Sequence, residues 1–475
     1  MIQDTQNRLR QAHCAVVGIG VSNLALIDFL LASGVTQITA RDGKTREQLG
    51  KTADMLEARG ITLKLGDSYL SGLCEDYIFR TPGIRPDLPE FLAAVQNGSV
   101  LSSEMELFFE LTPATVIGIT GSDGKTTTTT LTGLMLQKAC DTRGKGRVFV
   151  GGNIGEPLLP RVLDMTADDF AVVELSSFQL QSMKCSPLRA AITNITPNHL
   201  NWHTDMSEYA NAKKNIYIHS QNKLTVFNAE NGNTEKLADA LDRPVTRFSS
   251  SKTSHTLFQS TKKGDCAIYA RNGMIYHWDG ENETPILKTD DILLPGKHNL
   301  ENYMTAIALT RGLVSADNVR EVATTFEGVK HRLERIRTLH GVTYYNSSID
   351  SSPTRTAAAL SALHPRRPIV ICGGYDKNIP FEPLAEALCR HAKAVVLTGA
   401  TAEKIKRVLL QYAQQNMLDL PVRHEPIFQN AVLCAKDMAE DGDTVLLSPA
   451  CASFDAFQNF AQRGDTFRAI VEAFE

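Results

Sequence analysis

Short apolar runs alternate with amphipathic stretches along the first part of the chain, and this alternation predicts strands and helices in turn. Residues 13–20 form an apolar run that ends in glycines, as a buried strand does before a turn. Residues 24–32 predict a packed helix that Gly34 closes, and residues 35–40 predict the next strand. A further strand is expected over residues 76–80. This order predicts half of a dinucleotide-binding fold.

The same alternation continues to the C-terminus, which predicts an α/β fold throughout. A second unit starts near Thr115, and its polar stretch 249–283 predicts a hairpin-bearing sheet edge outside the core. After Gly312 a further parallel sheet is expected, with strands over residues 342–345, 368–372, 394–397 and 444–447. A chain of 475 residues suggests about three domains. We expect these domains to span residues 1–112, 113–312 and 313–475.

A glycine-rich turn follows the apolar strand expected over residues 116–120 and precedes Lys125 and Thr126 at the start of a helix. Backbone N–H groups of such a turn and helix point at phosphate oxygens. Lys125 would neutralise charge on the β and γ phosphates, and the Thr126 hydroxyl would bind Mg²⁺. Ile119 stands where the full phosphate-loop pattern has glycine, and Gly121 supplies the flexibility instead. The turn therefore predicts nucleotide binding, with a strand-turn-helix that binds nothing as the alternative.

An acid also stands at the end of an apolar strand in this unit. Glu174 ends the run 170–174, where it is either a Mg²⁺ ligand or an ordinary strand-end carboxylate. Ser176 and Gln179 add polar groups to the same rim. Asn153 lies in a second glycine-rich turn, from which it could reach a phosphate or a substrate carbonyl, although such a turn alone is more often a loop than a site.

Other polar residues of this unit have an ordinary structural interpretation beside a functional one. His199 follows a strand and is either structural or a ligand of Mg²⁺ or phosphate. Lys213 and Lys214 lie on a predicted helix, where two adjacent lysines normally face solvent. Asn299 and Asn302 share one face of a helix start, where they are caps or readers of an adenine edge.

The glycine turn of the first unit is a broken dinucleotide fingerprint. Gly18 and Gly20 are in place, but Asn23 stands where the third glycine belongs. Asp42 follows roughly 20 residues later in the chain, which is the spacing at which a carboxylate can accept a hydrogen bond from a ribose hydroxyl. The turn either binds a nucleotide diphosphate or is a tight turn alone.

Composition narrows the class of protein. The net charge of −4 argues against nucleic acid or an anionic membrane surface as the main partner. No apolar run approaches the ~20 residues needed to span a bilayer, and the first residues lack the apolar core of a secretory signal. The nine cysteines form no C-x-x-C pair, which favours free thiols in a reducing compartment over disulfides or a zinc site. A cytoplasmic protein is expected.

Taken in order, these residues resemble the Mur ligases, and the resemblance extends from Gly18 to the C-terminus. Each motif is modest alone, but their sequence along the chain is specific. The last one, continued through Phe454 to Gly464, is similar to the D-glutamate-adding branch of the family. The motifs are ITGSDGKT at 119–126, GGNIG at 151–155, ELSSFQ at 174–179, GKHN at 296–299, HR at 331–332 and LSPACAS at 447–453.

The resemblance implies a fold and a reaction. It implies a Rossmann-like domain for UDP, a central P-loop ATPase domain with a mostly parallel sheet, and a Rossmann-like C-terminal domain for the incoming amino acid. ATP would phosphorylate the carboxylate of UDP-N-acetylmuramoyl-L-alanine, and the amine of D-glutamate would attack the acyl phosphate. Such enzymes act mainly by positioning and charge stabilisation. The resemblance further implies that the protein uses ATP and two Mg²⁺ ions. It also implies that the protein is a monomer and acts in peptidoglycan precursor synthesis.

The resemblance also assigns roles to residues. The catalytic residues would be Lys125, Glu174, His199 and Lys213. The metal ligands would be Thr126, Glu174, His199 and a carbamylated Lys213. ATP would contact Gly121, Ser122, Asp123, Gly124, Lys125, Thr126, Thr127, Asn299, Asn302, Arg332 and Ser347. The UDP substrate would contact Gly20, Val21, Ser22, Asp42, Gly83, Asn153 and Ser176. D-Glutamate would contact Ser351, Lys377, Ser453, Phe454 and Phe460.

Some positions depart from the family pattern. Asp123 stands where the loop commonly has Asn, and Asn198 and Asn201 flank His199 where many members have Asp. Ser347 replaces a common Asp at a position where the family contacts the ribose. Ile349 replaces a frequent Lys, and Ser351 replaces a Thr at the glutamate site.

Several classes of protein compete at this stage. The alternatives are a sibling Mur ligase, a ligase like folylpolyglutamate synthase, a nucleotide-binding protein with decayed ligase activity, and a dinucleotide-dependent oxidoreductase. Retention of Lys125, Glu174, His199 and Lys213 argues against decay, and the broken fingerprint argues against the oxidoreductase.

Overall fold

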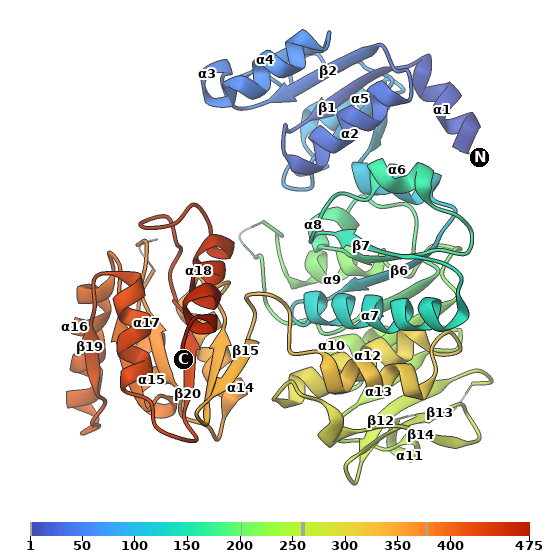
Figure 1. Cartoon of the computed structure of the whole chain (residues 1–475). Coiled ribbons are helices and arrows are strands. Elements are labelled where there is room, and N and C mark those ends of the chain that lie inside the picture. The colour runs from blue at the N-terminus through green and yellow to red at the C-terminus, as the bar shows by residue number, and fades with distance from the viewer. Residues whose placement is uncertain (1, 201, 258–261, 377–378) are drawn as a thin grey trace. The chain divides into compact units, whose positions relative to one another are not determined.

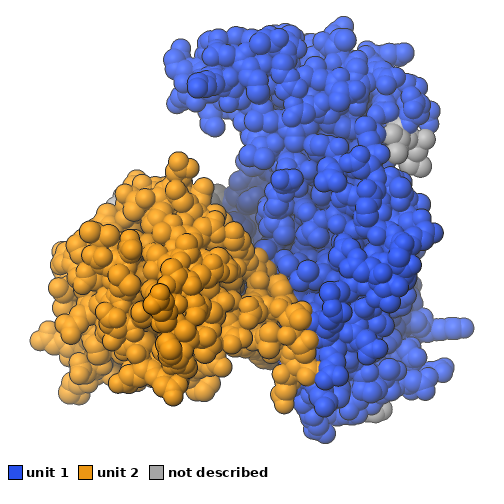
Figure 2. Space-filling model, in the orientation of Figure 1, with its two compact units in different colours: residues 1–289, 300–322 blue, residues 290–299, 323–475 orange. Residues whose placement is uncertain are grey.

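The computed structural model describes residues 2–200, 202–257, 262–376 and 379–475 and contains three sheets, each with helices packed on it (Figure 1). Two compact units divide the chain, one of residues 1–289 with 300–322 and one of residues 290–299 with 323–475 (Figure 2). The first unit holds two sheets and the second unit holds the third. The predicted α/β class is confirmed, and the three-domain division at 112 and 312 stays a prediction.

The N-terminal sheet is entirely parallel, with strand order β3-β2-β1-β4-β5. Its strands are β1 His13–Val17, β2 Gln37–Asp42, β3 Thr62–Leu65, β4 Tyr77–Arg80 and β5 Val100–Ser102. Its helices are α1 Ile2–Arg10, α2 Val21–Ala32, α3 Arg46–Leu49, α4 Lys51–Ala58, α5 Pro89–Gln96 and α6 Glu104–Leu111. The chain reverses its winding between β1 and β4, and open α/β sheets bind ligands at such a switch point. The predicted strands are confirmed with small shifts of their ends.

Asn23 explains how the glycine turn closes without its third glycine. Helix α2 begins at Val21, three residues earlier than predicted, so Asn23 lies in its first turn. The buried Asn23 amide donates hydrogen bonds to the carbonyls of Val17 at 3.0 Å and Gly18 at 2.8 Å. These bonds join the helix to the end of β1. In the usual fingerprint the third glycine makes this connection by letting the helix pack closely against the strand.

The central sheet has the order β14-β13-β12-β11-β10-β9-β6-β8-β7. Its strands are β6 Thr115–Thr120, β7 Val148–Gly152, β8 Phe170–Glu174, β9 Arg189–Ile192, β10 Leu224–Asn228, β11 Thr246–Ser249, β12 Cys266–Arg271, β13 Met274–Trp278 and β14 Glu283–Lys288. The helices that follow them in the chain are α7 Lys125–Arg143, η1 Leu159–Asp164, α8 Ser177–Leu180, α9 Met206–Lys214, α10 Gly232–Asp239, α11 Ser254–Leu257, η2 Thr289–Asp291, α12 Lys297–Thr310 and α13 Ala316–Thr325. Strands β6 to β12 pair in parallel, and β13 and β14 are antiparallel.

The predicted hairpin within 249–283 is confirmed as β12 and β13, but its exclusion from the core is wrong for β12. Ala267, Ile268 and Tyr269 are fully buried. Strand β12 lies between β11 and β13, so both of its edges are paired and its faces are covered. The polar residues that flank this strand concealed its burial in the sequence.

The C-terminal sheet has the order β15-β16-β20-β17-β18-β19. Its strands are β15 Glu334–Leu339, β16 Val342–Asn346, β17 Ile369–Cys372, β18 Ala394–Leu397, β19 Val422–His424 and β20 Thr444–Leu447. Its helices are α14 Pro353–Leu363, α15 Glu382–His391, α16 Ala402–Gln415, α17 Phe428–Asp437 and α18 Phe460–Glu472. The predicted parallel sheet is confirmed for five strands, whereas β15 pairs antiparallel with β16. Within the described residues no helix is long and apolar enough to cross a membrane.

Helix α6 begins with a buried carboxyl group. Ser103 caps the helix by accepting the Glu106 N–H at 3.2 Å. Glu104, only 6% exposed, accepts the Leu159 N–H at 3.3 Å, which is a weak bond for a buried charge. Burial therefore raises the pKa of Glu104 to about 7.

We expect Glu104→Gln to stabilise the protein at pH 8. Glu104 binds its proton more tightly in the folded chain, so its contribution is complete below pH about 4.5 and is lost as pH rises to about 7. The neutral amide avoids this loss, which amounts to about 3 kcal/mol at most. Unfolding by urea at pH 8 and pH 5 measures the difference. The exposed Glu90, changed to Gln, is the control, and a gain for Glu104→Gln that is equal at both pH values would contradict the expectation.

Candidate active site

The turn between β6 and α7 has a backbone that requires glycine at two positions. Gly121 has φ +154° and Gly124 has φ +78°, both in the region that side chains disfavour. A Cβ at Gly121 would lie 1.8 Å from Thr193 Oγ1, and one at Gly124 would lie 2.4 Å from Asn302 Oδ1. Helix α7 starts at Lys125, so the N–H groups of its first turn are directed at the loop. This geometry suits the binding of phosphate oxygens.

Residues that follow β9 hold the loop from outside. The Asp123 N–H donates to Asn194 Oδ1 at 2.9 Å. Ser122 Oγ donates to the Thr196 carbonyl at 3.0 Å and accepts the Thr196 N–H at 2.9 Å. Ser122 is also 2.9 Å from the Tyr209 hydroxyl of α9. Asp123, which differs from the common Asn, thus contributes its backbone to the loop's support.

Glu174 is buried at the end of β8, next to the start of α7. One carboxylate oxygen accepts the Thr126 hydroxyl at 2.8 Å, and the other accepts the Asn153 amide at 2.9 Å. The Asn153 N–H also donates to the Glu174 carbonyl at 2.8 Å. A carboxylate and a hydroxyl are the oxygen donors that Mg²⁺ prefers, so this pair fits the predicted metal. Asn153 orients the carboxylate from the other side.

Lys213 is buried, and the interpretation of the two lysines as a solvated helix face is wrong for it. Its Nζ donates to the Gly121 carbonyl at 2.9 Å and to Thr120 Oγ1 at 3.2 Å, and lies 4.7 Å from the centre of the Tyr209 ring. Burial, and next the charge of Lys125, hold the pKa of Lys213 well below its ordinary value. Burial therefore favours the neutral form of this amine more than it does for an exposed lysine. Lys125 Nζ donates to the carbonyls of Gly121 at 2.9 Å and Ser122 at 3.0 Å.

The predicted metal ligands do not form one cluster of imidazole and carboxylate groups. Within the described residues no group of three or more His, Cys, Asp or Glu side chains is arranged to hold a metal ion. His199 is exposed, has φ 56°, and its ring meets Phe178 edge-on at 4.9 Å. His203 is buried and bonds to Ser177 Oγ at 2.9 Å, which is a structural role. Thr126, Glu174 and Lys213 are therefore the predicted ligands that the fold brings to the phosphate loop.

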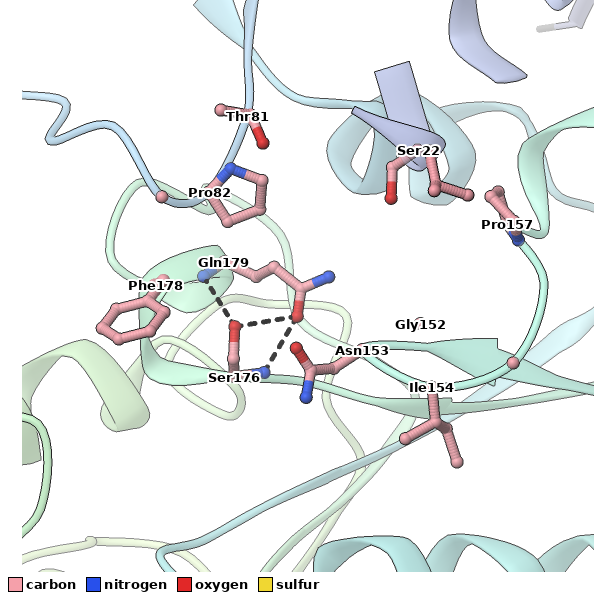
Figure 3. A pocket seen from close by; sticks show the side chains of 13 residues that line it. Ser22, Thr81, Pro82, Gly152, Asn153, Ile154, Pro157, Ser176, Phe178 and Gln179 are labelled. Carbon is pink, nitrogen blue, oxygen red and sulfur yellow. Dashed lines mark hydrogen bonds between the residues drawn. The ribbon is translucent and has the colours of Figure 1, made fainter. Parts of the chain in front are cut away.

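A cavity of about 470 Å³ is lined in part by Asn153, whose amide donates to the Glu174 carboxylate (Figure 3). Its lining residues come from four loops at the carboxyl ends of β1, β4, β7 and β8. They are Val21, Ser22, Thr81, Pro82, Gly83, Gly152, Asn153, Ile154, Gly155, Pro157, Ser176, Phe178 and Gln179. Five of these, Val21, Ser22, Gly83, Asn153 and Ser176, were assigned to the UDP substrate from the sequence. Figure 3 shows Asn153 and Ser176 on one side of the cavity and Ser22 on another.

The remaining two residues of the UDP prediction lie behind the lining. Gly20 is the N-cap of α2. Asp42 accepts the Ile19 N–H at 2.6 Å and the Lys44 N–H at 2.9 Å, so its carboxylate anchors the glycine turn. Ser176 caps α8 and exchanges hydrogen bonds with Gln179, as the dashed lines in Figure 3 show.

The residues predicted to contact adenine and ribose lie in both compact units. Asn302 belongs to the first unit, where its Oδ1 accepts the Thr128 hydroxyl at 3.2 Å. Asn299 belongs to the second unit and donates to the Pro295 carbonyl at 2.7 Å. In the same unit Arg332 is half-buried, and the buried Ser347 accepts the Leu333 N–H at 3.1 Å. The Ser347 hydroxyl thus orders the chain before β15.

The described residues among those predicted to bind glutamate lie in the second unit. Ser453 is buried, Phe454 is 64% exposed, and the Phe454 ring meets Tyr375 at 6.0 Å. Phe460 starts α18, and Ser351 is half-buried before α14. Lys377 lies outside the described residues.

Sequence reasoning missed Arg463, a buried guanidinium in α18 that bonds to the chain just before Ser453. It donates to Ser348 Oγ at 3.0 Å and to the Cys451 and Ala452 carbonyls at 3.1 Å each. Burial lowers the pKa of Arg463 to about 10, so it stays charged at neutral pH. Its position in the run Gln462 to Gly464, already noted as part of a motif, was the available signal.

Two sequence profiles match most of the chain. The Mur ligase middle domain covers residues 119–310, and the Mur ligase glutamate ligase domain covers residues 331–451. The chain belongs to the Mur ligase family. This confirms the resemblance seen in the sequence and accounts for the phosphate loop of this Mur ligase.

Curated relatives of this Mur ligase match it over nearly its whole length. A UDP-N-acetylmuramoylalanine–D-glutamate ligase of Acetivibrio thermocellus is 42% identical over an alignment of 478 positions, which covers 100% of this chain and 99% of the relative. The protein of the same name from Clostridium novyi is 43% identical over 465 residues, 98% of this chain and 97% of the relative.

Solved structures share the fold of this Mur ligase. The UDP-N-acetylmuramate-alanine ligase of Thermotoga maritima superimposes with a TM-score of 0.54 at 19% identity, covering 97% of this chain and 99% of that one. A pseudomurein peptide ligase type C from Methanothermus fervidus gives 0.52 at 18% identity, covering 98% and 100%. At these identities the likeness concerns the fold alone.

We expect Gly121→Ala to weaken nucleotide binding by about fivefold or more. The added methyl group collides with Thr193 Oγ1, and moving the loop costs about 1–3 kcal/mol that phosphate binding must repay. Titration with a fluorescent ATP analogue measures the change. Gly232→Ala is the control, because nothing lies within 4 Å of its Cβ position. Equal affinity of Gly121→Ala and the wild type would show that the loop's shape is unimportant.

Proposed function

We propose that this Mur ligase adds D-glutamate to UDP-N-acetylmuramoyl-L-alanine with hydrolysis of ATP to ADP and phosphate, in peptidoglycan precursor synthesis. The observation that carries the proposal is the match, over nearly the full length, to relatives named UDP-N-acetylmuramoylalanine–D-glutamate ligase. The phosphate loop, the Glu174–Thr126 pair and the buried Lys213 supply the matching chemistry. A cytoplasmic location and a monomeric state are part of the proposal.

The chemistry explains why a phosphate loop is needed for making an amide. A carboxylate is a poor electrophile, and transfer of a phosphoryl group to it creates a leaving group. The amine then attacks the acyl carbon, and phosphate departs with the former carboxylate oxygen. The N–H groups at the start of α7 and the Lys125 ammonium would hold the negative charge that moves between these groups.

Two of this chain's residues suit a magnesium ion beside the phosphates. Thr126 and Glu174 would hold it, and a bound Mg²⁺ would neutralise charge on the phosphate oxygens. Asn153 would keep the Glu174 carboxylate in place by its 2.9 Å hydrogen bond. His199 and a carbamylated Lys213 would serve a second ion. A neutral amine is the form that adds to carbon dioxide, and the lowered pKa of Lys213 supports this assignment.

The three substrates would occupy three regions of the chain. The UDP-linked substrate would lie in the cavity that Asn153 helps to line. The side chains of this cavity offer uncharged polar groups to the sugar and the base. ATP would use the phosphate loop with Asn299, Asn302, Arg332 and Ser347. D-Glutamate would bind near Ser351, Ser453, Phe454 and Phe460, together with Lys377.

Phosphate release tests the proposal directly. The protein is incubated with ATP, Mg²⁺ and UDP-N-acetylmuramoyl-L-alanine, and D-glutamate, L-glutamate, L-alanine, L-lysine or meso-diaminopimelate is added singly. We expect release with D-glutamate alone. Release with another amino acid would assign the chain to a sibling ligase, and no release with any of them would favour a decayed ligase.

We expect Lys213→Ala to lose turnover by at least ~100-fold and to regain part of it when a short-chain carboxylic acid is added, because the acid replaces the lost carbamate oxygens. Lys214→Ala is the matched control, since Lys214 is the next residue of α9 and only half-buried. The rate of ADP formation with and without 100 mM acetate, roughly the amount a weak surrogate ligand needs, is the measurement. Full activity of Lys213→Ala would refute the carbamate assignment.

A further inference from the structure

Arg80 is a buried arginine at the end of β4, directly beneath the cavity lining. Its side chain is among the largest in the described structure that are less than 2% exposed. Nη1 donates to the Ile84 carbonyl at 2.6 Å and, over longer distances of 3.3 Å, to the carbonyls of Thr81 and Pro82. The guanidinium therefore fixes the turn that follows β4 from below.

The other terminal nitrogen of Arg80 reaches a different loop. Nη2 donates to Ser182 Oγ at 2.7 Å and to the Phe178 carbonyl at 3.4 Å. Phe178 and the neighbouring Gln179 line the cavity next to Pro82, as Figure 3 shows. One side chain thus joins two walls of the cavity, one from the N-terminal sheet and one from α8.

The hydrogen bonds of Arg80 do not pair its positive charge with a carboxylate. All five oxygens that accept from it are neutral carbonyl or hydroxyl oxygens. None of the residues that line the cavity is ionisable. The acids whose charge is felt at Arg80 are Glu106 and Asp87, and burial raises the pKa of Glu106 to about 7, so its charge is incomplete at neutral pH. Burial lowers the pKa of Arg80 to about 10, which is still well above neutral pH, so Arg80 keeps its own charge.

Contacts with neighbouring segments hold the turn after β4 in place at both of its ends. The Thr81 N–H donates to the Val17 carbonyl at 2.8 Å, and a Cβ at Gly18 would lie 2.4 Å from Thr81 Cγ2. At its far end, Arg85 forms an ion pair with Glu208 of α9 at 2.7 Å, and the Trp202 indole donates to the Gly83 carbonyl at 3.3 Å. Among these residues, Arg80 donates hydrogen bonds both to the turn after β4 and to the segment at α8.

We propose that Arg80 is a positioning residue for an anionic, nucleotide-linked substrate, holding the turn 81–84 against α8 and supplying the positive charge beneath an uncharged cavity. The inference rests on the proposed function, because it assigns the cavity to the UDP-linked substrate. Arg80 does not line the cavity, so it acts through the walls and through its field.

Kinetics with Arg80→Met test the proposal. We expect KM for UDP-N-acetylmuramoyl-L-alanine to rise roughly tenfold or more, because bonds from a charged donor are lost at both walls. The kcat and the KM for ATP stay within about twofold, since the phosphate loop does not contact Arg80. Arg189→Met is the matched control, because Arg189 is a partly buried arginine that donates to two carbonyls, those of Leu309 and Arg311, away from the cavity.

Two further variants keep the proposal falsifiable. Arg80→Lys retains the charge without the forked donors, and we expect a KM between those of the wild type and Arg80→Met. If Arg80→Met does not fold, Ser182→Ala removes the 2.7 Å bond and is expected to raise the same KM roughly threefold or more.

The outcomes separate this inference from the proposed function. An unchanged KM for the UDP-linked substrate in Arg80→Met, or in Ser182→Ala if that variant carries the test, overturns the positioning role. An equal rise in the KM for ATP also overturns it, because the effect would then be general. A wild-type protein that releases no phosphate with any amino acid refutes the proposed function instead.

Discussion

The close packing around Gly121 is the constraint on which the candidate site depends. Thr193 Oγ1 occupies the space where a Cβ would stand, and Lys125 and Lys213 both donate to the Gly121 carbonyl at 2.9 Å. Two ammonium groups that share one acceptor repel each other, which disfavours the charged form. Lys213 is buried, and burial together with the charge of Lys125 lowers its pKa. The packing around Gly121 thus fixes the shape of the loop and brings both lysines to one acceptor.

The site residues gather because parallel strands end at the same edge of a sheet. Strands β6, β8 and β9 are neighbours, so the phosphate loop, Glu174 and Thr193 meet at their carboxyl ends. In the N-terminal sheet, β1 and β4 are neighbours where the winding reverses, which brings the two turns of the cavity wall together. The fold thus makes one site from loops that lie far apart in the chain.

The sequence was informative where local pattern decides structure and silent where burial depends on distant partners. Strands 394–397 and 444–447 were predicted with their correct ends, because each is an apolar run between clear breaks. The burial of Lys213 was not predictable from its helix, since its acceptors lie more than 90 residues away. Arg80 and Arg463 were missed for the same reason: arginine in a sequence normally indicates solvent, and their acceptors are carbonyls that only the fold assembles. The roles assigned to ligand-contacting residues stay predictions.

The order of strands in the C-terminal sheet has a consequence for how the chain folds as it is synthesised. Strand β20 is the last strand in sequence, yet it lies between β16 and β17 and pairs with both. Until residue 447 has left the ribosome, the earlier strands can form only two separate fragments with an open gap between them. The sheet of the second compact unit therefore closes only after β20 has been made, whereas both sheets of the first unit are complete in sequence well before it.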